Sequence, residues 1–351
     1  MAFDDLGAWL DVGPDSDVVV SSRVRIARNM ACFPFVNRAT QGQCQEIVAL
    51  TRQALAECDL GNQPTNEMIW VDLDQASDRE RMLLVERHLI SRHHAETRAS
   101  KAVAVARDES MSLMVNEEDH LRLQVLTAGL QFDQAFDRIC QVEQGLESSL
   151  EYAFSPRWGY LTACPTNVGT GARFSVMMHL PGLLITREIE RVKRSAKDLH
   201  LAVRGHYGEG SESTGDLFQI SNQITLGQSE DELMAEFQQR VIPRIIDYER
   251  QARQMLLKKN PLLLDDRVHR ALNILRSAHL LGVDEAMKYL SRVRLGIFLE
   301  RITDIDPALI NKLFLLLQPG HLSPEDETVG TEKLRARRAT IVRQALRTNE
   351  K

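Results

Sequence analysis

Hydrophobic and polar residues along the chain predict a mixture of strands and helices. Residues 17–28 begin with a β-branched run and then alternate polar and apolar side chains, as a half-buried strand does. Residues 102–106 and 112–115 are apolar and flank the polar segment 107–110, which predicts a hairpin. Four further short strands are expected, at residues 174–179, 201–204, 217–221 and 223–226.

Apolar residues with helical spacing predict three helices before residue 200, over residues 40–58, 128–151 and 185–199. Ser229 followed by Glu232 matches a capping box, so another helix begins there and extends towards Lys259. Asn260 precedes Pro261, and a residue before proline disfavours the helical conformation, so this helix is expected to end at residue 260.

After residue 260 the pattern becomes almost purely helical. Its apolar residues fall at positions i, i+3, i+4 and i+7, as in Val268, Ala271, Leu272 and Leu275. We therefore expect an α+β domain over residues 1–260, with an antiparallel sheet flanked by helices. An all-α domain over residues 261–351 follows it.

Composition and charge exclude several classes of protein. Of the 351 residues 43% are hydrophobic, which is too apolar for a disordered chain. Lys and Arg number 43 against 49 Asp and Glu, so the net charge of −6 offers no basic excess for non-specific nucleic-acid binding. The longest apolar stretches are too short to span a bilayer. No nucleic-acid or membrane partner is therefore expected.

The cysteines and the N-terminus favour a cytoplasmic protein. The five cysteines are odd in number and lack CxxC spacing, which argues against a disulfide framework or a zinc site. They are Cys32, Cys44, Cys58, Cys140 and Cys164. Residues 1–15 contain no basic segment of the kind that opens a secretory signal.

Three segments place arginines on expected strands or loops, at residues 21–25, 171–173 and 204–209. Arg23 and Arg25 are two apart in a strand, so their guanidinium groups share one face. Adjacent cations repel unless an anion lies between them, and a polyphosphate suits their geometry. Taken singly, pairing with surface carboxylates is the simpler explanation for each arginine.

Two other segments carry groups that favour chemistry. Residues 116–122 place three consecutive acids beside a histidine and an arginine, although a solvated turn explains them equally well. Residues 164–171 form a glycine-bearing loop whose backbone N–H groups suit an anion, but they match neither a Walker A nor a GxGxxG motif. Taken alone, Cys164 is compatible with a small buried hydrophobic residue.

Taken together, the motifs SSRVR, NEEDHLR, CPTNVGTGAR and RGHYGEGSESTGDLFQISNQ closely resemble those of the ATP:guanido phosphotransferases. The resemblance extends over essentially the whole chain and is greatest to the bacterial protein-arginine kinases of this family. It implies ATP and Mg²⁺ as cofactors and transfer of the γ-phosphoryl group to a guanidino group.

The resemblance also implies which residues bind the nucleotide. Five arginines would hold the ATP phosphates: Arg23, Arg25, Arg122, Arg173 and Arg204. His88 resembles a further nucleotide contact, although a surface histidine on a helix is an equally good explanation. The other expected contacts are Ser22, Val24, Phe174, Ser175, Val176, Met177, Gly205, His206, Tyr207, Gly208 and Glu209.

Three residues match the catalytic positions of the family. Glu118 is expected to act as the base that accepts a proton from the guanidinium, and Glu209 to clamp and orient it. Cys164 is expected to tune and position the acceptor. Glu117 is expected to contact the hydrated Mg²⁺, and no residue is assigned as a direct metal ligand.

The length before Ser21 favours a polypeptide substrate. Small-molecule members of the family carry a helical domain ahead of this strand, and 20 residues are too few for one. An arginine side chain on a protein is therefore the expected acceptor. A free guanidino compound such as arginine is the alternative. A silent adaptor that binds arginine-rich partners is a third hypothesis, but every expected catalytic group is present.

The resemblance further implies marking of proteins for Clp-type proteolysis in a stress response, a McsA-type activator and a homodimer. Protein-arginine kinases usually carry an RDxxRA motif near the C-terminus, which binds phosphoarginine. Aligning Arg338 and Ala339 with its end puts Leu334 and Arg335 where Arg and Asp should stand. Phosphoarginine binding is therefore doubtful here, and a basic amphipathic helix is the simpler interpretation.

Overall fold

The computed structural model describes residues 7–58, 67–96, 100–205, 214–323 and 330–347. The chain divides into two compact units that alternate along the sequence. The first comprises Met1–Trp9, Ser21–Val176 and Ser221–Arg240, and the second comprises Leu10–Val20, Met177–Ile220 and Val241–Lys351. The boundary expected near residue 260 coincides with the break between two helices, and the two-domain division stays a prediction.

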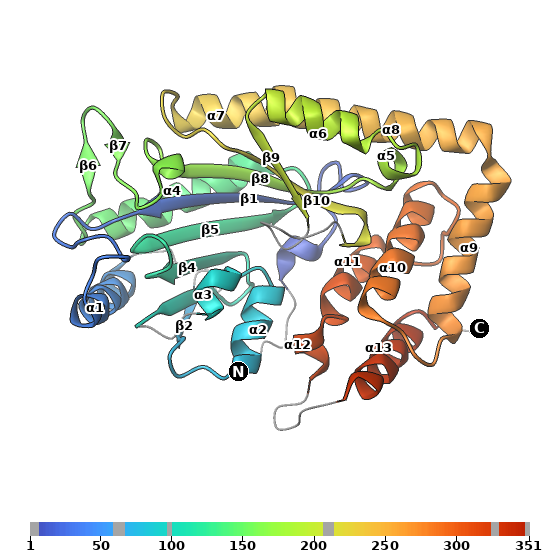
Figure 1. Ribbon diagram of the computed structural model, residues 1–351, viewed down its shortest axis with the longest axis horizontal. Coiled ribbons are helices and arrows are strands. Elements are labelled where there is room, and N and C mark those ends of the chain that lie inside the picture. The colour runs from blue at the N-terminus through green and yellow to red at the C-terminus, as the bar shows by residue number, and fades with distance from the viewer. Residues whose placement is uncertain (1–6, 59–66, 97–99, 206–213, 324–329, 348–351) are drawn as a thin grey trace. The chain divides into compact units, whose positions relative to one another are not determined.

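The described strands build one large sheet in the order β2-β3-β4-β5-β1-β8-β10-β9 (Figure 1). The strand bounds are β1 Val19–Arg28, β2 Met68–Asp72, β3 Ala102–Ala106, β4 Met111–Val115, β5 Leu121–Ala128, β8 Ala172–His179, β9 Leu201–Gly205 and β10 Leu217–Asn222. Pairs β2–β3, β3–β4, β4–β5 and β1–β5 are antiparallel. A separate two-stranded hairpin joins β6 (Phe154–Ser155) and β7 (Gly159–Tyr160).

In the first unit, helices cover the sheet. Its helices are α1 Gln41–Glu57, α2 Asp78–Glu86, α3 Arg92–Glu96, α4 Phe132–Glu147 and α7 Glu230–Glu236. Leu84 and Leu89, from and just after α2, pack on Val103, Val105 and Met114 of the sheet. The rings of Phe132 on α4 and Phe174 on β8 meet edge to face at 5.8 Å. The sheet therefore has one face under α2 and another under α4.

The second unit is mainly helical. Its helices are α5 Pro181–Ile185, α6 Ile189–Asp198, α8 Ile242–Lys259, α9 Pro261–Ser277, α10 Val283–Phe298, α11 Pro307–Leu316, α12 Pro319–Leu322 and α13 Thr331–Ala345. Leu272, Leu290 and Leu313, from α9, α10 and α11, share one apolar core, which Val342 of α13 joins. None of the helices in the described residues combines the length and apolar character needed to cross a membrane.

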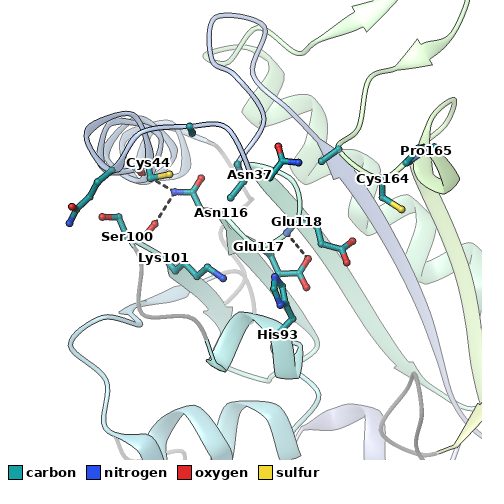
Figure 2. Close-up of a pocket in the computed structure, with 14 residues that line it drawn as sticks. Asn37, Cys44, His93, Ser100, Lys101, Asn116, Glu117, Glu118, Cys164 and Pro165 are labelled. Carbon is teal, nitrogen blue, oxygen red and sulfur yellow. Dashed lines mark hydrogen bonds between the residues drawn. The ribbon is translucent and has the colours of Figure 1, made fainter.

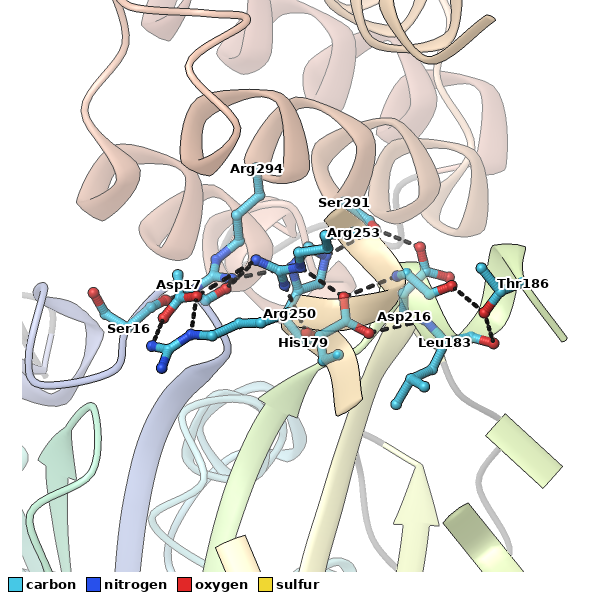
Figure 3. A network of polar contacts seen from close by, with 12 residues as sticks. Ser16, Asp17, His179, Leu183, Thr186, Asp216, Arg250, Arg253, Ser291 and Arg294 are labelled. Atoms are coloured by element: carbon cyan, nitrogen blue, oxygen red, sulfur yellow. Dashed lines mark hydrogen bonds and ion pairs between the residues drawn. The ribbon is translucent and has the colours of Figure 1, made fainter. Parts of the chain in front are cut away.

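A buried polar network lies inside the second unit (Figure 3). Arg294 on α10 donates to the Ser16 carbonyl at 2.6 Å and to Oδ1 of Asn311 at 3.0 Å. Its Nη1 lies 3.0 Å from Nδ1 of His179, whose Nε2 contacts Oγ of Ser291 at 2.9 Å. Burial and the nearby arginines hold the pKa of His179 well below its usual range, so its ring is neutral and accepts from Arg294.

Several sequence expectations are confirmed. The strand over 17–28 is β1, and the hairpin around residues 107–110 joins β3 to β4 with Ala102 opposite Val115. The helix expected over 40–58 is α1, and Ser229 caps α7 within the expected capping box. The expected antiparallel sheet with flanking helices and a helical C-terminal region is the observed fold class.

The strand expected at residues 223–226 is wrong. The chain leaves the sheet after Asn222, whose side-chain amide donates to the Ile224 carbonyl at 3.0 Å. Thr225 then bonds the 164–170 loop, because its Oγ1 donates to the Val168 carbonyl at 2.8 Å and its own carbonyl accepts from Thr170. Residues 223–226 do alternate polar and apolar side chains, but Thr225 forms its hydrogen bonds with the 164–170 loop and not with a neighbouring strand.

The helix expected over 40–58 is found as α1, whereas those expected over 128–151, 185–199 and 229–259 are shorter or divided. Residues up to Ala128 belong to β5, so the helix expected over 128–151 begins at Phe132. Arg187 has a φ of 63°, which separates α5 from α6 within the expected 185–199 helix. Between α7 and α8 lies a π-helical stretch, Phe237–Val241, just before Pro243, whose ring nitrogen has no hydrogen to donate.

Candidate active site

Four of the five expected phosphate-binding arginines gather on one face of the sheet in the first unit. Arg23 and Arg25 point to one side of β1, and Ala27 of the same side pairs with Arg122 of β5. Nε of Arg23 donates to Oγ of Ser175, which shares its side of β8 with Arg173. We call Arg23, Arg25, Arg122 and Arg173 the arginine array.

The positive charges of the arginine array repel one another. The pKa of Arg25 lies well below the usual guanidinium value because of burial and because Arg122, Arg23 and Arg173 repel its charge. Glu117 is the carboxylate that partly offsets this repulsion. Such an arrangement costs folding free energy and suits a multiply charged anion, because a polyphosphate would neutralise several of these cations together.

His88 lies at the edge of the array. Gln124 is opposite Arg25 in the β1–β5 register, and its Nε2 donates to the His88 carbonyl at 2.6 Å. The His88 ring meets the Trp9 ring edge to face, with centroids 5.6 Å apart. The left-handed φ of 58° at His88 turns the chain out of α2 at this point. His88 thus lies in the turn after α2, over the central strand β5, and not within a helix.

Glu117 is held by three hydrogen bonds. One oxygen accepts from Oγ of Ser91 at 2.6 Å, and the other accepts from Nη1 of Arg122 and from the backbone N–H of Glu118 at 2.9 Å. Burial opposes its ionisation, but Arg122 and these hydrogen bonds prevail and lower its pKa to about 2. Glu117 is therefore a charged partner for Arg122 at any physiological pH.

Glu118 extends outwards from the same turn. Its side chain is 45% exposed, and its Oε2 lies 3.9 Å from Nη2 of Arg122. The turn between β4 and β5 is tight, since Asn116 has a φ of 60° and donates its N–H to the His120 carbonyl at 2.9 Å. His120 in turn accepts the N–H of Met30 on its Nδ1. Glu118 is thus an accessible carboxylate on a rigid support, next to the arginine array.

A cavity of about 730 Å³ opens beside Glu118 (Figure 2). It lies entirely within the first unit. Its lining residues are Val36, Asn37, Ala39, Gln41, Cys44, His93, Ser100, Lys101, Asn116, Glu117, Glu118, Ala163, Cys164 and Pro165. Two of the three expected catalytic residues, Glu118 and Cys164, therefore line one cavity.

The loop that carries Cys164 is tied to the Glu118 turn. Asp119 accepts the backbone N–H of Ala163 at 2.7 Å and a side-chain N–H of Asn29 at 2.7 Å. Sγ of Cys164 lies 3.1 Å from Oγ1 of Thr166. Further along the loop Gly169 has a φ of 111°, and an added Cβ would lie 2.2 Å from the Thr225 carbonyl oxygen, so only glycine fits.

Four of the expected nucleotide contacts direct their side chains to the opposite face. Phe174 and Val176 alternate with Arg173 and Ser175 along β8 and are buried, as is Val24 on β1. Oγ of Ser22 donates to the Gly129 carbonyl at 2.7 Å, in the turn before α4. These side chains hold the sheet to its helices, and a nucleotide would meet only the backbone at these positions.

The remaining expected contacts lie elsewhere. Met177 packs against the helical core of the second unit. Arg204 and Gly205 end β9, which also belongs to the second unit. His206, Tyr207, Gly208 and Glu209 lie outside the described residues.

Sequence reasoning missed several residues of the cavity. Lys101, His93, Cys44 and Asn37 line it, although no motif contains them. Asn116 belongs to the NEEDH motif, but its position in the cavity depends on its left-handed φ, which no spacing rule predicts. Among the described residues no group of three or more His, Cys, Asp or Glu side chains is arranged to hold a metal ion.

Arg338, at the end of the degenerate RDxxRA segment, has a structural position. It is buried on α13, where its Nε donates to the Leu317 carbonyl at 2.8 Å and its Nη1 to the Leu281 carbonyl at 2.9 Å. These two hydrogen bonds connect α13 to the C-terminal end of α11 and to the loop before α10. The segment therefore contributes to the fold of the second unit.

Two family models match the chain. The model described as "ATP:guanido phosphotransferase, C-terminal catalytic domain" matches residues 46–252. The model described as "Protein-arginine kinase McsB C-terminal domain" matches residues 261–351.

Two solved structures share the fold of this chain. A duplicated taurocyamine kinase from Schistosoma mansoni has a TM-score of 0.62 at 23% identity, covering 72% of this chain and 35% of that one. A lombricine kinase has a TM-score of 0.56 at 24% identity, covering 71% of this chain and 70% of that one.

Curated relatives are similar over nearly the full length. The protein-arginine kinase of Halothermothrix orenii is 44% identical over 91% of this chain and 90% of its own. The protein-arginine kinase of Halalkalibacterium halodurans is 44% identical over 95% of this chain and 93% of its own. The protein-arginine kinase of Geobacillus kaustophilus is 42% identical over 99% of this chain and 95% of its own. The chain therefore belongs to the ATP:guanido phosphotransferase family and, within it, to the protein-arginine kinases.

Proposed function

We propose that this protein transfers the γ-phosphoryl group of ATP to the guanidino group of arginine side chains in proteins. The observation that carries the proposal is the junction between the arginine array and the cavity beside Glu118. Arg122 belongs to the array, and its ion pair with Glu117 supports the turn that projects Glu118 towards the cavity. A phosphate-binding surface and an acceptor site therefore share one support.

The arginine array fits the phosphates of ATP. Its cations repel one another and depress the pKa of Arg25, so an anion that contacts several of them would be bound favourably. Little covalent help is needed for phosphoryl transfer, and positioning with charge neutralisation supplies most of the rate. Mg²⁺ bound to the phosphates would neutralise further charge while keeping several of its waters, so a cage of protein ligands is not required.

Glu118 would act on the acceptor. A guanidinium is a poor nucleophile because its charge is delocalised and its pKa exceeds about 12. In the proposed step a guanidino nitrogen forms a bond to the γ-phosphorus, the bond from phosphorus to the ADP oxygen breaks, and Glu118 accepts the proton lost by the nitrogen. Cys164 would position the acceptor in the same cavity. The roles expected for Arg204 and Glu209 stay predictions.

A protein acceptor is supported by the curated relatives, each of which is called a protein-arginine kinase. To test it, the enzyme is incubated with Mg·ATP and either an unfolded arginine-rich protein or free arginine, and ADP formation is measured. We expect clear preference for the protein. Preference for free arginine would contradict the proposal and favour a small-molecule arginine kinase.

We also infer a cytoplasmic stress-response role, in which phosphorylated proteins pass to a Clp-type protease and a McsA-type activator assists the kinase. A homodimer is supported by apolar side chains exposed on the second unit, where Leu262 on α9 is 83% and Leu263 50% exposed. Analytical ultracentrifugation at micromolar concentration tests the dimer, and a monomer there would contradict it.

A further inference from the structure

Lys101 places a positive charge in the cavity proposed for a positively charged acceptor. It lines the same cavity as Glu118 and Cys164. It is also the only lysine among the first 192 residues, in which arginine supplies every other side chain that is cationic at neutral pH apart from the histidines. A guanidinium entering this cavity is therefore repelled by Lys101, and a negative charge carried by the same acceptor would offset that repulsion.

Lys101 is almost completely buried. Its exposed fraction is 4%, and no described residue forms a hydrogen bond or an ion pair with its ammonium group. Figure 2 shows the ammonium pointing towards the side of the cavity that carries Glu117. Burial lowers the pKa of Lys101, while the charge of Glu117 and the thiol of Cys44 oppose that decrease. A buried ammonium without a partner is costly, so a partner from outside is expected to stabilise it.

Glu117 forms neither a hydrogen bond nor an ion pair with Lys101. Its two oxygens accept instead from Ser91, Arg122 and the Glu118 backbone. Glu118 lies on the same turn and pairs at long range with Arg122. The hydrogen-bonding capacity of Lys101 is therefore left for a ligand in the cavity.

Asn116 adds a second unused group to the same cavity. Its side-chain N–H groups donate to the carbonyls of Cys44 and Ser100, both at 2.9 Å. Its Oδ1 is buried and accepts no hydrogen bond from any described residue. With respect to the described residues, the ammonium of Lys101 and Oδ1 of Asn116 therefore have no hydrogen-bond partner in this cavity, and the two residues are 96% and 99% buried. Buried polar atoms of this kind are usually satisfied, and a bound ligand would satisfy both.

We propose that Lys101 and Asn116 form a carboxylate subsite, which binds an acidic group carried by the arginine acceptor. Lys101 would pair with the carboxylate, and Oδ1 of Asn116 would accept an N–H of the same acceptor. The proposal rests on the proposed function, because it deepens the account of the acceptor cavity. It makes Lys101 a specificity-determining residue, which selects arginines that lie beside a negative charge.

The carboxylate has two possible sources. One is an Asp or Glu side chain next to the target arginine in a polypeptide, and the other is the α-carboxylate of free arginine. Two ligand pairs separate them: peptides that differ only by Asp or Asn beside the arginine, and arginine against argininamide. Binding is measured without nucleotide, by fluorescence anisotropy for labelled peptides and by calorimetry for the small molecules.

We expect the wild type to bind the Asp peptide roughly tenfold more tightly than the Asn peptide, as for one charge-assisted hydrogen bond. Lys101→Met should remove this difference, whereas Lys101→Arg should keep part of it. A difference confined to arginine and argininamide would assign the subsite to a free acceptor. Equal affinities within both pairs, or a difference that survives in Lys101→Met, would overturn the subsite.

Lys258→Met is the matched control, since Lys258 is exposed on α8 and should leave all affinities unchanged. If Lys101→Met does not fold, the wild type alone still tests the subsite. Raising the salt concentration should then weaken the Asp peptide more than the Asn peptide, and equal weakening would overturn it. Failure of the proposed function is distinguishable, because it would show as absent phosphorylation of every acceptor while these binding differences remain measurable.

Discussion

Glu117 binds the guanidinium of Arg122 inside the first unit, and its other oxygen fixes Ser91 just before α3. This one ion pair connects the arginine array to the turn that carries Glu118. The two neighbouring glutamates therefore differ in role because of their surroundings, since Glu117 is 3% exposed while the Glu118 side chain is 45% exposed.

Glu118→Gln should abolish transfer while leaving ATP affinity nearly unchanged. The amide keeps the size of the side chain but cannot accept the proton, so the loss falls on the transition state. We expect the rate of ADP formation with a protein acceptor to fall about 10²–10⁴-fold, the usual contribution of a general base. Glu46→Gln, at an exposed position on α1, is the control. A Glu118→Gln enzyme with wild-type rates would remove the assignment.

Glu117 should make stability depend on acidity. Its pKa of about 2 in the folded protein lies below the ordinary value of 4.5, so the ionised carboxylate stabilises the fold above that ordinary value. This stabilisation is lost progressively as the pH falls from about 4.5 towards 2. Urea unfolding of the wild type and of Glu117→Gln should show a difference in unfolding free energy that is large at neutral pH and narrows in this acid range. A difference that is constant with pH would contradict the pKa shift.

Arg25→Gln should weaken ATP binding without destabilising the ligand-free protein. Its pKa is depressed by burial and by three neighbouring arginines, so the charged form is disfavoured in the folded state. Removing the charge relieves that repulsion but also removes a phosphate partner. We expect at least a tenfold rise in the Kd for ATP, with an unfolding temperature equal to or above that of the wild type. Arg52→Gln, at an exposed position on α1, is the control and should change neither the Kd for ATP nor the unfolding temperature. A large drop in the ligand-free stability of Arg25→Gln would contradict the account.

Arg294→Met should destabilise the second unit strongly. The substitution leaves the Ser16 carbonyl, Asn311 and His179 without their buried donor. Breaking a buried charged network of this kind costs about 3–5 kcal/mol. Urea unfolding measures the loss, and Arg270→Met is the control, because Arg270 pairs with Asp266 at the surface. Equal effects of the two substitutions would show that the network contributes little.

Alternation in strands was sufficient to place Arg23 and Arg25 on one face, and the structure agrees. It was not sufficient to place Arg122 beside them, because that depends on the β1–β5 register, in which Ala27 pairs with Arg122. β5 itself was not predicted, since the acidic residues before it favour a turn and hide the strand that follows. Register is set by long-range pairing, which local pattern does not contain.

Within the cavity, motif residues were predictable and their neighbours were not. Glu118 and Cys164 belong to specific motifs, so they could be named from the sequence. Lys101 directly precedes an ordinary buried strand, β3, and belongs to no motif, so nothing in its local sequence indicates a site. Its significance comes from its burial and from the absence of a hydrogen-bond or ion-pair partner among the described residues, which only the folded chain reveals.

We propose that this chain phosphorylates arginine side chains with Glu118 as the base. Mass spectrometry of a test protein treated with the enzyme and Mg·ATP tests it most directly, with sample handling kept free of acid because the phosphorus–nitrogen bond is acid-labile. We predict phosphate on arginine residues with the wild type and, after the same incubation, at least about a hundredfold less with Glu118→Gln. Unmodified arginines with the wild type, or phosphate found only on hydroxyl side chains, would contradict the account.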